Sequence, residues 1–98
     1  MSRYYRRAEV IELLSLREDF LDDLLRETSL FEEVEGAFSA DDVERIWIAH
    51  RLEEDLGLDW AAIEVVVRMR ERMIAERRQL LAVIEALRRR LMQAEKER

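Results

Sequence analysis

The sequence predicts an all-α protein with a small helical head and one long C-terminal helix. Proline is absent and glycine occurs only at Gly36 and Gly57, so few hairpins or irregular loops can form and helix is the default. Residues 60–98 contain neither glycine nor proline and are rich in Ala, Leu, Glu, Arg, Met and Gln, which favour helix. We therefore predict a head over residues 1–58 and a long dimerisation helix over residues 59–98.

Three helices are predicted within the head from the spacing of apolar residues. Their expected ranges are about 8–14, 18–27 and 40–56. The second has a single apolar face, because its apolar residues fall at i, i+1, i+4 and i+5. Residues 15–17 are expected to form a turn, and residues 28–37 to be irregular or weakly extended.

The boundaries of the third helix are marked by capping residues. Ser39 is the expected N-cap, with Asp42 three residues further on as an acidic variant of the capping box. Gly57 is well placed as the C′ residue that ends the helix. Two residues later, Asp59 is the expected N-cap of the next helix.

A heptad seam runs along the long helix and predicts pairing with another helix. Ile at a and Leu at d favour two strands, whereas an arginine at a favours one register at some cost in stability. A helix of about 36 residues spans about 54 Å, and a head of about 60 residues has a radius of gyration of about 10 Å. The far end therefore needs a partner, most simply a second copy in a coiled coil or helical bundle. The predicted dimerisation residues are Met73, Arg77, Leu80, Ile84, Leu87 and Leu91.

Charge is distributed unevenly within a net charge of −6. Residues 1–7 carry three arginines, which gives +3. Residues 8–64 carry 18 acids against four arginines, −14, and residues 65–98 carry ten basic residues against five acids, +5. An acidic head of this kind repels nucleic acid and attracts basic protein surfaces.

Few residues could carry chemistry. There is no cysteine, hence no disulfide framework and no thiolate metal site. His50 is the only histidine, and we expect a solvent-facing or locally bonded side chain there rather than a metal ligand. Two isolated glycines cannot form a phosphate-binding loop, and no Ser-His-Asp or Cys-His set exists. We predict no enzyme activity, no catalytic residue, no cofactor and no metal.

We expect different environments for the two tryptophans. Trp60, in the first turn after an N-cap, is predicted to fill the core. For Trp47 a core position is also favoured, but the third helix already has an apolar face without it, so contact with the first helix or with a partner stays open. No run of about 18 apolar residues occurs, and we expect a cytoplasmic protein with no membrane partner.

The order of elements resembles the MerR-like winged helix-turn-helix group: two short helices, a charged wing-like stretch, a capped helix and a coiled coil. Within that group, Leu-Gly-Leu-Asp-Trp-Ala-Ala-Ile-Glu-Val over residues 56–65 is similar to the Leu-x-Leu-Asp-Trp-x-x-Ile-x-Val stretch of CbpM-type chaperone modulators. The likeness covers residues 8–95 in layout and is specific over about 42–67. Residues 15–17 depart from the group's Gly-Val-Ser-like turn, and the wing lacks the usual Pro and Arg.

The resemblance implies binding to the J-domain of a DnaJ-like co-chaperone of CbpA type and restraint of its action with DnaK. J-domains of this kind present a basic face to DnaK, so a competitor is expected to be acidic. A DNA-reading helix would need arginine or lysine instead, and residues 17–36 contain only Arg17 and Arg26 against eight acids. DNA binding is therefore disfavoured. The predicted partner-binding acids are Glu18, Asp19, Asp22, Asp23, Glu27, Glu32, Glu33 and Glu35.

Two alternatives remain at this point. A MerR-like transcription regulator would contact DNA through the arginines of residues 3–7 or of residues 88–90, and its binding would collapse steeply with salt. A structural dimer or antitoxin-like partner would explain the coiled coil and leave the Leu-Asp-Trp stretch unexplained. The direction of the coil and the choice between inhibition and assistance also stay open.

Overall fold

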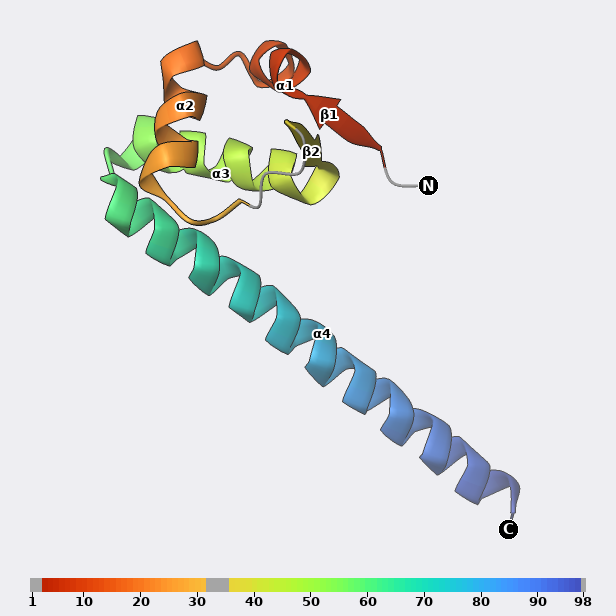
Figure 1. Cartoon of the computed structure of the whole chain (residues 1–98). Coiled ribbons are helices and arrows are strands. Elements are labelled where there is room, and N and C mark those ends of the chain that lie inside the picture. The colour runs from red at the N-terminus through yellow and green to blue at the C-terminus, as the bar shows by residue number, and fades with distance from the viewer. Residues whose placement is uncertain (1–2, 32–35, 98) are drawn as a thin grey trace. The chain divides into compact units, whose positions relative to one another are not determined.

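The computed structural model describes residues 3–31 and 36–97 and is mostly helical, as predicted (Figure 1). The chain divides into two compact units, Met1–Arg68 and Met69–Arg98. The first unit therefore includes the beginning of the long helix. The elements in chain order are β1 (Tyr4–Arg6), α1 (Arg7–Leu14), α2 (Glu18–Glu27), β2 (Ala37–Ser39), α3 (Ala40–Leu56) and α4 (Trp60–Lys96).

The prediction of a purely helical class missed a short two-stranded ribbon. Strands β1 and β2 pair antiparallel, with Tyr4 opposite Ser39, Tyr5 opposite Phe38 and Arg6 opposite Ala37. Each strand has three residues, which is too short for the alternating apolar pattern that identifies a strand in a sequence. The ribbon brings the N-terminal segment beside the start of α3.

Capping side chains set the helix boundaries, and the predicted ranges of α2 and α3 are confirmed. At the start of α3 the Ser39 hydroxyl accepts a hydrogen bond from the Asp42 amide at 3.1 Å, and the Asp42 carboxylate accepts one from the Ser39 amide at 3.0 Å. Gly57 ends the helix with a φ of 63°, a conformation that glycine adopts without strain. The Asp59 carboxylate accepts a bond from the Ala62 amide at 2.8 Å and caps α4.

The predicted turn between α1 and α2 is present, and it is closed without a glycine. Ser15 adopts the left-handed conformation with a φ of 53°. The Leu16 amide donates to the Ile11 carbonyl at 2.9 Å, which closes the turn at the end of α1. Leu16 is buried, so the turn contributes to the core as well as reversing the chain.

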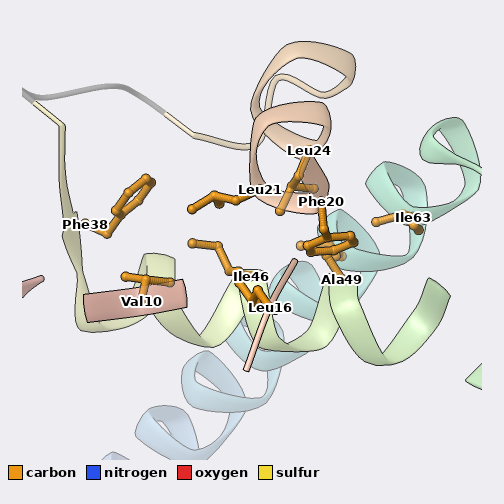
Figure 2. Packing of buried hydrophobic residues seen from close by; sticks show 10 residues of the cluster. Val10, Leu16, Phe20, Leu21, Leu24, Phe38, Ile46, Ala49 and Ile63 are labelled. Carbon is orange, nitrogen blue, oxygen red and sulfur yellow. The ribbon is translucent and has the colours of Figure 1, made fainter. Parts of the chain in front are cut away.

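One apolar core holds the first unit together (Figure 2). It takes side chains from α1, α2, β2, α3 and the first turns of α4, and it contains no buried charged or polar residue among those that the structure describes. Burial of large aliphatic and aromatic side chains of this kind contributes about 1.5–3 kcal/mol each. The core residues are Val10, Leu16, Phe20, Leu21, Leu24, Phe38, Ile46, Ala49, Ile63 and Val67.

The second unit consists of the remainder of α4. Over residues 69–97, which the structure describes, this unit has no other element for the helix to pack on, and its side chains are exposed from Ala75 to Glu97. Among the residues that the structure describes, no helix is long and apolar enough to cross a membrane.

Candidate partner-binding surface

The acidic residues of α2 lie opposite the face that enters the core. Phe20, Leu21 and Leu24 are buried, and the side chains between them point away because successive helical residues are about 100° apart. Among the predicted partner-binding acids, this arrangement gathers Glu18, Asp19, Asp22, Asp23 and Glu27 along one helix, with all but half-buried Asp23 exposed. Glu32, Glu33 and Glu35 lie outside the described residues.

The arginines beside this acidic face form ion pairs with its carboxylates. Arg26 contacts Asp23 at 2.6 Å and Glu27 at 3.4 Å. The hydrogen bond to Asp23, followed by that to Glu27, raises the pKa of the Arg26 guanidinium above its ordinary value. Arg7 of α1 forms an ion pair with Asp22. These pairs are solvent-exposed, so each contributes little to stability, and the five acids of α2 outnumber Arg7, Arg17 and Arg26, the arginines that pair with them.

Arg17 joins the acidic face of α2 to the end of α3. Its guanidinium lies 3.0 Å from Glu53 of α3 and 3.7 Å from Asp19 of α2. The C-terminal part of α3 is itself acidic, with Glu53, Glu54 and Asp55 in succession. Acids of α2 and α3 therefore share one arginine, which the sequence did not reveal because residues 17 and 53 are far apart along the chain.

A second polar cluster fastens the segment after α2 to the first turns of α4. Glu64 accepts hydrogen bonds from the Ser29 amide at 2.6 Å and from the Ser29 hydroxyl at 2.8 Å. Arg68 donates to the Ser29 carbonyl at 3.0 Å and lies 3.7 Å from Glu64. The Ser29 amide, then its hydroxyl, lowers the pKa of the Glu64 carboxyl, because bonds to the charged form favour it. No pattern in the sequence indicated this cluster.

His50 was predicted to be solvent-facing or locally bonded, and the structure shows it enclosed, with a neighbour on its own helix. Its side chain is only 16% exposed and its ring meets that of Phe20 edge-on, with centroids 5.1 Å apart. Its Nδ1 atom is buried with no hydrogen-bond partner, and Nε2 lies 3.7 Å from Glu54. Across residues 3–31 and 36–97, no group of three or more His, Cys, Asp or Glu side chains is arranged to hold a metal ion.

The two tryptophans differ, and the favoured core position of Trp47 is wrong. Trp60 is partly buried and packs against Phe20, with ring centroids 5.6 Å apart. Trp47 is 42% exposed, because α3 already sends Ile46 and Ala49 into the core. The signal for this was in the sequence: α3 has a complete apolar face without Trp47.

The predicted dimerisation residues all lie on α4, from Met73 to Leu91. The five apolar members are between 36 and 65% exposed, and Arg77 is exposed as well. A heptad seam of this kind is stable when a second helix covers it. The pairing itself remains a prediction.

Comparisons of the chain with models of protein families, with curated proteins and with solved structures find no match.

Proposed function

We propose that this chain modulates a J-domain co-chaperone by binding the basic face of the J-domain with its acidic head. The observation that carries the proposal is the solvent face of α2, where five carboxylates stand together and outnumber the three arginines that pair with them. A basic protein surface is the electrostatic complement of such a face. The choice of a J-domain as partner is supported by the likeness of residues 56–65 to CbpM-type modulators.

The same acidic face argues against DNA as the partner. Phosphates carry negative charge, and a helix that approaches them contributes favourably only through arginine, lysine or neutral donors. Two of the N-terminal arginines that could assist are occupied, since Arg3 contacts Glu9 at 3.4 Å and Arg7 pairs with Asp22.

The proposed mode of action is competition. A head that covers the basic face of the J-domain removes the surface through which the J-domain acts with DnaK, so the modulator inhibits. Association between an acidic and a basic surface is fast and sensitive to salt, because long-range attraction raises the encounter rate.

We also propose that α4 pairs with α4 of a second copy through the seam from Met73 to Leu91. Exposed apolar side chains repeated on one side of a helix gain burial only when another surface covers them. The dimer would present two acidic heads to its partners.

Charge reversal on α2 tests the proposal. Asp19→Lys with Glu27→Lys reverses two exposed acids at opposite ends of α2, so the loss of favourable interaction with the helix dipole at one end is offset at the other. We expect this variant to bind a cognate J-domain about tenfold more weakly in a calorimetric titration, mainly through slower association.

A matched control changes the net charge equally outside this face. Glu12→Lys with Glu95→Lys alters α1 and the end of α4, and we expect binding close to that of the unmodified chain. Equal binding by the α2 variant and the control would refute the proposed surface. Binding to DNA fragments that weakens steeply with salt, together with no J-domain binding, would favour a transcription regulator instead.

A further inference from the structure

Trp47 is an exposed aromatic side chain on the head that the acidic face of α2 does not explain. Isolated exposed apolar residues are common on protein surfaces, so exposure alone indicates nothing. A tryptophan, however, carries more apolar surface than most side chains, and its burial against a partner yields correspondingly more free energy. The surroundings of the ring decide whether it is suited to that role.

The indole is held in position by its neighbours on α3. The Arg51 guanidinium carbon lies 5.6 Å from the ring centroid, and Arg51 is itself fixed by Asp55 at 2.6 Å. The His50 ring lies 6.2 Å from the indole on the same helix and packs edge-on against Phe20 of the core. A side chain that is already ordered loses little conformational entropy when it is bound.

Acidic side chains contact the two residues that flank this aromatic group, since Asp55 pairs with Arg51 and Glu54 lies 3.7 Å from the His50 Nε2 atom. Glu54 and Asp55 are half-exposed, and Glu53 continues through Arg17 to Asp19 of α2. Both arginines in this region, Arg17 and Arg51, contact acids of the chain. The C-terminal end of α3 is thus net negative, with Glu53, Glu54 and Asp55 against Arg51, and Arg17 links it to the acidic face of α2.

We propose that Trp47 is the apolar anchor of a docking site on α3 for a basic segment of a partner protein, with Glu54 and Asp55 at its edge. Lysine and arginine suit this arrangement, because their aliphatic stems cover apolar surface while their charged ends reach carboxylates. Central tryptophans often dominate binding energy, and surrounding charges raise the association rate. This inference deepens the proposed function and rests on its requirement for a basic protein partner.

The test uses the full chain and two probes, a cognate J-domain and a short amphipathic helical peptide of lysine, arginine and leucine. Trp47→Ala removes the indole from an exposed position, and Leu13→Ala is the control because Leu13 is a similarly exposed apolar residue of the head, on α1. We expect Trp47→Ala to weaken binding about 30-fold, as truncation of a central tryptophan does, and Leu13→Ala to leave it within about threefold. Circular dichroism verifies that both variants fold.

If the J-domain binds the unmodified chain, its binding to Trp47→Ala tests the docking site. If the J-domain does not bind the unmodified chain, binding of the peptide tests the docking site instead. Binding of the J-domain that is equally tight with Trp47→Ala overturns the docking site and leaves the proposed function intact. Failure of the J-domain to bind, with peptide binding that depends on Trp47, overturns the proposed function and supports the docking site. Failure of both probes to bind the unmodified chain overturns both.

Discussion

The cluster of Ser29, Glu64 and Arg68 gives the sharpest stability prediction. Glu64→Ala removes both hydrogen bonds that the carboxylate accepts from Ser29. Ser29→Ala removes the hydroxyl's bond to Glu64 and the weaker 3.3 Å bond that the hydroxyl accepts from Arg68, and it keeps the amide's bond to Glu64. A bond to a charged group contributes about 1.5–3 kcal/mol when buried. These bonds are exposed to solvent, so we expect about 1.5 kcal/mol for Glu64→Ala and about 0.7 kcal/mol for Ser29→Ala.

A double-mutant cycle measures the interaction directly. Because both single variants lose the hydroxyl bond, the double variant should be less destabilised than the sum of the two, by about 0.5 kcal/mol. Urea unfolding at fixed protein concentration, followed by tryptophan fluorescence, provides the free energies of unfolding, since association would otherwise shift the apparent stability. Glu85→Ala, at an exposed position on the same helix, is the control and should change little. Strict additivity of the two single variants would refute the reasoning.

The stabilisation that Glu64 contributes should decrease as the pH falls. Its pKa is lowered in the folded state, so the carboxylate contributes stability above its ordinary pKa of 4.5 and loses it as the pH falls through the folded value. We therefore expect the difference in free energy of unfolding between the unmodified chain and Glu64→Gln to be largest near neutral pH and to shrink below about pH 4.5. A difference that grows on acidification would show that the carboxylate is not stabilised in its charged form.

Three further substitutions test the core, a helix end and the seam. Ile46→Ala empties a fully buried position and should cost about 2–5 kcal/mol in denaturant unfolding; less than about 1 kcal/mol would contradict the packing. Gly57→Ala places a Cβ in open space at a φ of 63°, so its cost is backbone strain alone. We expect a loss of about 1 kcal/mol in the free energy of unfolding, measured by thermal unfolding. Gly57→Asn should cost less, because asparagine adopts this backbone conformation more readily. Leu87→Asp introduces a charge at a d position of the seam and should convert a dimer to a monomer in sedimentation equilibrium. The control Glu85→Asp should leave the dimer intact. An unmodified chain that is monomeric at high concentration would refute the proposed pairing.

The helix boundaries could be predicted because they depend on local chemistry. Ser39 with Asp42, Gly57 and Asp59 each act on backbone groups within a few residues, so the sequence alone contains the required information. The apolar face of α2 was predictable for the same reason. Its spacing determines which side of the helix is buried.

The parts that were missed depend on residues far apart in the chain. The pairing of Tyr5 with Phe38, the bridge from Arg17 to Glu53 and the bonds from Ser29 to Glu64 each need two segments brought together by folding. The enclosure of His50 likewise results from Phe20 on another helix. For the candidate site, the sequence indicated the acids of α2 but not their link through Arg17 to Glu53 of α3.

The pairing of β1 with β2 has a consequence for the order in which the chain folds. Residues 7–36, including α1 and α2, separate the two strands, so the ribbon must close a loop whose ends are distant in sequence, whereas each helix forms from neighbouring residues. We expect the ribbon amides to gain protection from hydrogen exchange after those of α2 and α3, and to lose it first under native conditions. Strand β1 would then be the last element to join the fold, after the helices have assembled.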